Sequence, residues 1–223
     1  MDWQMSNYMP RFDAWKWGLL DWNGRINPLA TMIKCCHEFT AVSQGYMHEL
    51  FEDAQGLQDL IRQEHRKAHG IINGIDTEVW NPMTDIMLND HYSRENFEEG
   101  KEKNKKWLCE EYGLNPELPL FAFIGRFARE KGADMLPDIV RRSISETEGA
   151  LNILILGSGN PQIENTLKQL QEEFHVNFAM DLGYKEALSH KIYAGADFLL
   201  MPSRVEPCGL NQMYAMRYGT IPI

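Results

Sequence analysis

The protein has 223 residues, 43% of them hydrophobic, which is enough for one large core or for parts of two domains. Its formal net charge of −10 argues against nucleic acid or another polyanion as a partner, and no continuous basic surface is indicated. The cysteines show neither a C-x-x-C pair nor a Cys/His spacing suited to zinc, so we expect free thiols and no metal site at Cys35, Cys36, Cys109 and Cys208.

The two ends of the chain bear on location and completeness. The first residues, MDWQMSNYMPRFDAWKW, are aromatic and polar and lack the apolar core of a signal peptide. No apolar run reaches membrane-spanning length, so we expect a cytoplasmic protein without a membrane partner. The chain starts without a leading strand and stops within an expected strand at residues 220–223. We therefore expect a piece of a longer protein.

The N-terminal third predicts short alternating elements. Asn27 followed by Pro28 is typical of a helix start, because asparagine caps free amides and proline suits the first helical turn. By itself, the later pair Asn73-Gly74 is a turn signal. We predict a helix at residues 29–38, a strand at 39–42 that ends at Ser43, a helix at 46–51 and a short strand at 70–72.

Residues 93–112 predict one long, charged helix that ends at Gly113. We interpret its basic run, residues 101–106, as a solvated face without a function. Its expected apolar contacts are Phe97, Trp107, Leu108 and Tyr112.

From residue 118 onward, strands alternate with helices. Such alternation specifies parallel, right-handed βαβ units with helices on both faces of a sheet. We therefore expect residues 118–223 to form a Rossmann-like α/β core. The predicted strands are residues 118–125, 151–156 and 176–180, and the predicted helices are residues 133–145, a segment that begins at Pro161, and residues 185–194.

Residues 197–218 combine a strand, a loop and a helix start. The apolar run 198–201 predicts a buried strand, Pro202 ends it, and a helix is expected to begin at residues 208–210. The free N–H groups of such a helix start lie where open α/β sheets bind ligands. By spacing alone, Glu206 is either a ligand-binding carboxylate or a simple charge at a helix N-terminus.

The exact order of residues in this stretch is more informative than the spacing of its elements. Residues 203–220, SRVEPCGLNQMYAMRYGT, closely resemble the donor-sugar loop of bacterial glycogen synthases and plant starch synthases. The resemblance implies an α/β protein of GT-B type, with one Rossmann-like parallel-sheet domain and the remnant of a second. It also implies a retaining glucosyltransferase that uses ADP-glucose, has the non-reducing end of an α-1,4-glucan as acceptor, and needs no other cofactor.

The resemblance extends over nearly the whole chain and implies its division. IINGID followed by Trp80-Asn81-Pro82 resembles the interdomain crossover of these synthases. Residues 1–72 are then the end of the N-terminal, acceptor-side domain, and residues 73–223 are a nucleotide-sugar-binding C-terminal domain, truncated at its end. The family's Lys-x-Gly-Gly-Leu and Thr-Gly-Gly-Leu loops are absent, so we expect a fragment that is inactive alone.

Arg126 and Lys131 follow one predicted strand in the sequence GRFAREKG. A guanidinium holds phosphate oxygens bidentately, and a lysine acts as a point charge. The Arg-x4-Lys spacing before a glycine resembles the family's diphosphate clamp. The alternative, a solvated charge paired with Glu130, fits Arg129 better than these two cations.

Gly157 and Gly159 follow the next predicted strand. A dinucleotide-binding motif is rejected, because its third glycine would fall at Gln162 and Pro161 occupies the turn. The resemblance implies that this loop lies at the nucleotide end of the donor and that Tyr184 lies against the adenine. The alternative for Tyr184 is a half-buried tyrosine that caps a helix.

The resemblance also assigns the sugar contacts. Glu206 would contact the transferred glucose, Asn73 would lie at the sugar subsite, and the hydroxyls of the glucose would be held by the N–H groups of Cys208, Gly209 and Leu210. The broader E-x7-E pattern has its second glutamate where this chain has Tyr214, which leaves the ribose contact open.

Two further kinds of chemistry are not indicated. A nucleophilic Cys208 would require a neighbouring base, and the nearest histidine in sequence, His190, is expected in a helix without Asp or Asn support. No D-x-D motif is present, so a metal-bridged diphosphate is not expected.

Retention without a protein nucleophile suggests attack on the face from which the phosphate departs. Arg126 and Lys131 would neutralise that phosphate, which would stabilise the oxocarbenium-like transition state and take the acceptor proton. Two alternatives remain: a non-catalytic sugar or nucleotide binder on the same fold, and a related retaining glycosyltransferase that uses UDP-glucose.

Overall fold

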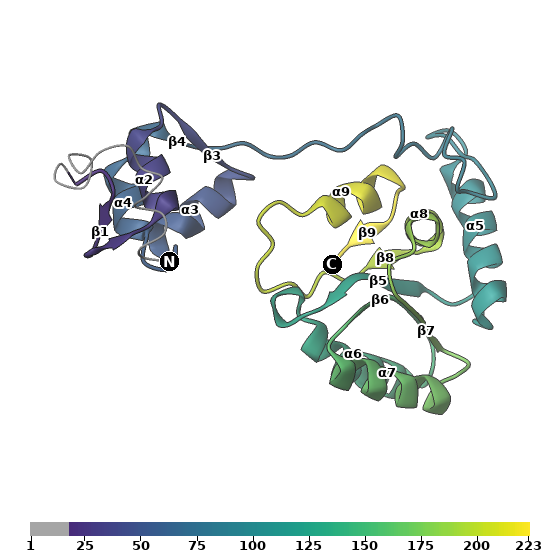
Figure 1. The fold of residues 1–223 in the computed structure, drawn as a ribbon. Coiled ribbons are helices and arrows are strands. Elements are labelled where there is room, and N and C mark those ends of the chain that lie inside the picture. Colours follow the sequence, from purple (N-terminus) through teal and green to yellow (C-terminus); the bar gives the residue numbers. More distant parts are fainter. Residues whose placement is uncertain (1–17) are drawn as a thin grey trace. The chain divides into compact units, whose positions relative to one another are not determined.

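The computed structural model describes residues 18–223 (Figure 1). The chain forms two compact units, one ending at Asn73 and the other beginning at Gly74. The first 17 residues, on which the expected absence of a signal peptide rests, lie outside the described part. Within that part, no helix combines the length and apolar character needed to cross a lipid bilayer.

The first unit is a small α/β arrangement. Asn27 caps helix α2 as predicted, because the Asn27 side chain accepts hydrogen bonds from the amides of Leu29 and Ala30 at 3.0 and 3.2 Å. Strands β3 and β4 pair in parallel. From residue 18 to Asn73, the elements are β1 (Asp21–Trp22), β2 (Arg25–Ile26), α2 (Pro28–Cys35), β3 (Phe39–Ala41), α3 (Gln44–Glu52), α4 (Gln58–Gln63), η1 (His65–Lys67) and β4 (Ala68–Gly70).

The structure of this unit differs in detail from what was expected. Helix α4 and the β1–β2 hairpin were not predicted. The strand expected at residues 70–72 lies earlier, because pairing with β3 ends at Gly70; Ile71 and Ile72 are 60% and 65% exposed. Ser43 does more than end a strand, since its side chain caps α3 through the amide of Tyr46.

Helix α5 (Phe97–Tyr112) is the first helix of the second unit; it ends at Gly113 as predicted but begins at Phe97, not at Ser93. The interpretation of its basic run as a solvated face was wrong. Lys101 and Lys105 are one helical turn apart, on the same side as buried Leu108. Lys105 forms an ion pair with Asp197 at 2.7 Å. Burial lowers the pKa of Lys101 to about 7.

The ammonium of Lys101 joins α5 to the carboxyl end of α8 and to Thr220, which follows the last helix of the chain. It donates to the hydroxyl of Thr220 at 2.8 Å and to the carbonyl oxygens of Ala196 and Ala194 at 2.9 and 3.1 Å. These carbonyls lie at the end of α8 (Glu186–Gly195), where a cation is favourable. The run therefore contains a structural lysine as well as solvated ones.

The main sheet confirms the expected Rossmann-like α/β core. In residues 74–223, all of which are described, five parallel strands lie in the order β7-β6-β5-β8-β9. The strand order reverses between β5 and β8, which makes this the switch point of the sheet. The strands are β5 (Leu120–Phe127), β6 (Asn152–Gly159), β7 (Phe178–Leu182), β8 (Phe198–Leu199) and β9 (Ile221–Pro222).

Helices cover both faces of this sheet (Figure 1). On one face, α6 (Leu136–Glu146) and α7 (Pro161–Glu173) pack over alternate residues of β5 and β6. On the other, α5, α8 and α9 (Leu210–Arg217) enclose a second apolar cluster. Two short turns of 3₁₀ helix, η2 (Arg129–Lys131) and η3 (Ala133–Met135), join β5 to α6.

Candidate functional site

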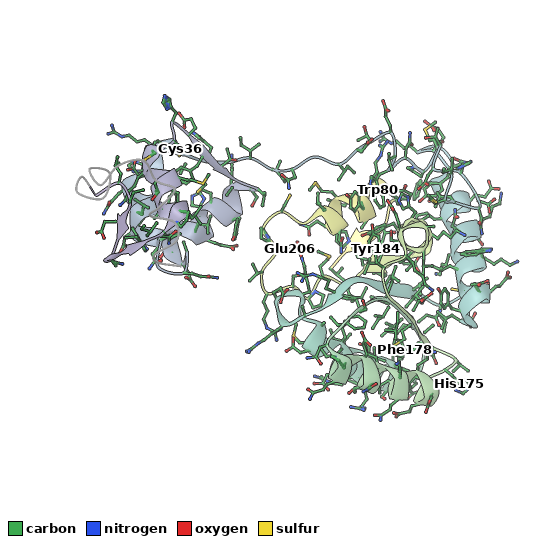
Figure 2. The ribbon with its side chains drawn as sticks, viewed as in Figure 1. Cys36, Trp80, His175, Phe178, Tyr184 and Glu206 are labelled. Carbon is green, nitrogen blue, oxygen red and sulfur yellow. The ribbon has the colours of Figure 1, made fainter. Side chains whose placement is uncertain are left out.

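The predicted cation and carboxylate meet beside the switch point. Lys131 follows β5, Glu206 follows β8, and these two strands are neighbours in the sheet. The Nζ of Lys131 lies 2.8 Å from Oε2 of Glu206, and the side chains are 29% and 24% exposed. The hydroxyl of Ser203 donates to the same carboxylate oxygen at 2.9 Å. Figure 2 shows Glu206 on the loop that leads into α9.

Arg126 lies apart from this pair. It belongs to β5 and not to the loop, because pairing with β6 continues to Phe127. Its side chain is 74% exposed, and Nη2 lies 3.0 Å from Oε1 of Glu130. The expectation that Arg129 would be the partner of Glu130 was therefore wrong. The Arg126 guanidinium is therefore exposed enough for a phosphate group to reach it.

The helix start after Glu206 depends on a glycine. Gly209 has φ 81° and ψ 57°, in the left-handed region, and immediately precedes α9. A Cβ at this position would overlap the side chain of Gln212. The helix therefore begins at Leu210, not at Cys208, and no acidic side chain occupies its first turn. The amides of its first turn have no intrahelical acceptors, so this end suits ligand oxygens.

Gly157 and Gly159 have a structural reason to be glycines. A Cβ at Gly157 would overlap the carbonyl oxygen of Gly125 on β5, and one at Gly159 would lie 2.7 Å from the carbonyl oxygen of Phe127. The amide of Gly159 donates to Glu164 at 2.8 Å. The two strands thus approach closely at the edge where the nucleotide end was predicted.

Tyr184 lies just beyond β7, as labelled in Figure 2. It is 87% exposed, so the alternative of a half-buried capping tyrosine was wrong. A fully presented ring is free to stack on a planar ligand. Its contact with adenine stays a prediction. Asn73, the last residue of the first unit, likewise keeps its sugar role only as a prediction.

The sequence patterns did not predict a buried polar network that joins Asp85, His190 and Tyr218. The Nδ1 of His190 lies 2.6 Å from Oδ2 of Asp85, and both side chains are 2% exposed. The hydroxyl of Tyr218 donates to the same oxygen. Burial, with Asp85 beside it, raises the pKa of Tyr218 well above its ordinary value. The expectation that His190 lacks Asp support was wrong, because its partner lies 105 residues earlier.

An aromatic stack connects this network to the site helix. Trp80 stacks on His190, with ring centroids 3.7 Å apart, and on Tyr214, with centroids 3.8 Å apart. Tyr214 occupies the second position of the E-x7-E pattern, so an aromatic contact replaces a carboxylate there. No sequence signal relates Trp80 to α9, because stacking partners carry no common motif.

No metal centre emerges from the described residues, since nowhere in that part do three His, Cys, Asp or Glu side chains form a group that could hold an ion.

Comparisons with known proteins found similar sequences and similar folds. Residues 118–223 match the family model described as Glycosyl transferases group 1. A glycogen synthase of Flavobacterium johnsoniae is 54% identical over 97% of this chain, which covers 46% of that protein. Starch synthase 2 of Arabidopsis thaliana is 40% identical over 89% of the chain, which covers 26% of it.

Among solved structures, the chain is similar to the catalytic domain of starch synthase IV from Arabidopsis thaliana bound to ADP and acarbose. That match has a TM-score of 0.81 at 35% identity and covers 91% of this chain and 42% of the other. The chain spans less than half the length of the curated relatives named above.

Proposed function

Since this chain is a relative of the bacterial glycogen synthases and plant starch synthases, with a fold of the GT-B type, we propose that it carries the donor-binding part of a retaining glucosyltransferase. The whole enzyme transfers glucose from ADP-glucose to the non-reducing end of an α-1,4-glucan. The observation that carries this proposal is the pairing of Lys131 with Glu206 at the switch point, where Glu206 belongs to the stretch 203–220 that resembles the donor-sugar loop of the synthases.

The pairing supports a division of roles within the donor site. Glu206 faces the glucose, while Lys131 and Arg126 neutralise the diphosphate. Each cation has a carboxylate partner in this structure, Glu206 for Lys131 and Glu130 for Arg126. When the donor enters, its phosphate oxygens replace these carboxylates, so binding exchanges ion pairs and leaves no cation unpaired.

Backbone groups complete the proposed site. The amides of Cys208, Gly209 and Leu210 hold the sugar hydroxyls at the start of α9. Gly157, Gly159 and Tyr184 lie toward the nucleotide. The solved starch synthase IV domain, which is bound to ADP, supports adenine over uracil at this end.

The proposed reaction uses these positions as follows. The acceptor hydroxyl attacks from the face that the phosphate leaves, and the departing phosphate receives its proton. Lys131 and Arg126 stabilise the charge that develops on the phosphate, and this contribution is larger in the transition state than in the ground state.

The two units have different roles in this proposal. Residues from Gly74 onward bind the donor, and the unit that ends at Asn73 belongs to the acceptor side. We place the protein in the cytoplasm, because all four cysteines are free thiols, as expected in a reducing compartment.

The test is transfer of radiolabelled glucose from ADP-glucose to glycogen, by this chain and by a protein extended at both ends to the length of its relatives. We expect incorporation only by the extended protein, with ADP-glucose preferred over UDP-glucose. The shorter chain lacks the contacts to ADP that the absent family loops would supply. Each such charge-assisted contact is worth about 1.5–3 kcal/mol, so losing two would weaken ADP binding by roughly two orders of magnitude or more.

Two results would contradict this proposal in different ways. Comparable incorporation by the chain and the extended protein would refute the division of labour between the two halves. An extended protein that binds the donor but transfers nothing would favour a non-catalytic binder instead.

A further inference from the structure

The loop that carries Glu206 is attached to the loop that carries Lys131 by a second set of contacts, centred on Arg204. Nη1 of Arg204 donates to the carbonyl oxygen of Arg129 at 2.9 Å. Nη1 and Nη2 also donate to the two carboxylate oxygens of Asp134, at 2.6 and 2.9 Å. One guanidinium therefore holds both ends of the turn that contains Lys131.

The backbones of the two loops are joined at the same place. The amides of Arg204 and Val205 both donate to the carbonyl oxygen of Glu130, at 2.9 and 3.2 Å. Gly132 has φ +67°, and a Cβ there would overlap the carbonyl oxygen of Pro202. This approach is closer than any side chain would allow, so the relative position of the two loops is set tightly.

The geometry of the Arg204–Asp134 pair separates it from an ordinary surface ion pair. The side chains are 40% and 43% exposed, and pairs this exposed usually contribute little. Bidentate pairing and a third acceptor on the same guanidinium are the exception. The hydrogen bond from Arg204 also lowers the pKa of Asp134. A lysine cannot reproduce this fork, because its donors diverge from a single nitrogen.

We propose that Arg204 is a positioning residue: anchored on Asp134 and Arg129, it sets Ser203 and Glu206 against Lys131. Arg204 itself is bound to neither member of the Lys131–Glu206 pair. Ser203 and Glu206 both belong to the segment that Arg204 anchors, and the hydroxyl of Ser203 donates to the carboxylate of Glu206. The role in catalysis rests on the proposed function, whereas the positioning of the pair does not.

The experiment measures the reactivity of individual lysine amines in the intact chain. Trace acetylation with acetic anhydride, followed by mass spectrometry of peptides, gives a labelling rate for each lysine. Lys131 reports the pair with Glu206, exposed Lys103 is the reference, and Lys105, with a side chain 15% exposed, reports the integrity of the fold.

The variants are Arg204→Gln, Arg204→Lys and Asp134→Asn. Arg142→Gln is the matched control, because Arg142 forms an exposed pair with Glu146 on α6. We expect the rate at Lys131 to rise about three- to fivefold in the three test variants, a change that corresponds to ~0.6–1 kcal/mol. Rates at Lys103 and Lys105 should stay unchanged, as should every rate in the control.

An unchanged rate at Lys131 in Arg204→Gln and Asp134→Asn would overturn the proposal. Arg204→Lys behaving like the parent would overturn the need for the guanidinium fork. If Arg204→Gln also exposes Lys105, Asp134→Asn decides, since it preserves side-chain volume. Joint exposure of both lysines there would show that the contact holds the fold and not the pair.

Activity gives a second, separate readout. In the extended protein, Arg204→Gln should lower kcat more than it weakens ADP binding, because the displaced Lys131 still meets the diphosphate. Absence of transfer by the unmodified extended protein would refute the proposed function and leave the labelling result valid.

Discussion

The ammonium of Lys131 lies 2.8 Å from the carboxylate of Glu206, although 75 residues separate them in the chain. The two residues follow adjacent parallel strands, β5 and β8, at the point where strand order reverses. A cation and a carboxylate that satisfy each other keep the site neutral before a ligand arrives. In the proposed function, each of the two is then available to a different part of a sugar diphosphate.

The first prediction concerns Glu206→Gln in the extended protein. Turnover should fall by orders of magnitude while ADP affinity stays the same or rises, because the carboxylate faces the sugar and its loss frees Lys131 for the diphosphate. The measurements are kcat and the Kd for ADP, with Glu146→Gln on α6 as control. Parallel loss of turnover and ADP binding would refute the assignment.

Asp85→Ala should cost about 3–5 kcal/mol of unfolding free energy, because it leaves His190 and the hydroxyl of Tyr218 buried without their shared acceptor. Urea denaturation measures the change. Glu99→Ala, which breaks an exposed pair with Lys103 on α5, should leave the free energy of unfolding nearly unchanged. Equal costs for the two variants would show that the buried network contributes nothing beyond a surface pair.

Gly157→Ala should destabilise the chain by about 1–3 kcal/mol, because the added methyl group overlaps the carbonyl oxygen of Gly125 and forces β5 and β6 apart. Gly74→Ala is the control, since a Cβ there would have no neighbour within 4 Å. Thermal unfolding of the two variants provides the comparison. A neutral Gly157→Ala would indicate that the strands relax without cost.

Lys101→Met should remove a pH dependence of stability. The pKa of Lys101 is about 7 in the folded state, below its ordinary 10.5 in the unfolded chain. Above pH 7 the unfolded state therefore binds more protons, so stability rises with pH through this window, on the order of 1 kcal/mol per pH unit. Below about pH 7 this contribution is flat.

The charged groups beside Lys101 are Asp197, which favours the ammonium, and Lys105, which opposes it. Burial raises the pKa of Cys109 to about 11, which lowers stability at high pH, so urea unfolding is compared between pH 7 and about 8.5. Lys103→Met, on the exposed side of α5, should keep the rise seen in the parent. A rise retained in Lys101→Met would assign it to another group.

Much of the local structure could be predicted from the sequence. Three examples are the helix start at Asn27-Pro28, the helix end at Gly113 and the strand–helix alternation after residue 118. Each depends on the preferences of residues that are close together in the chain. The stretch at residues 203–220 predicted a kind of ligand site for a similar reason, because the residues that carry the resemblance are consecutive.

The tertiary structure alone decided which distant groups meet. The basic run of α5 looked uniformly solvated, yet one helical face turns Lys101 toward carbonyls more than ninety residues away. Asp85 and His190 share no motif, and Arg204 finds Asp134 only because β8 lies beside β5. Periodicity records that a face is buried but not what it is buried against, since the partner is set by the order of strands in the sheet.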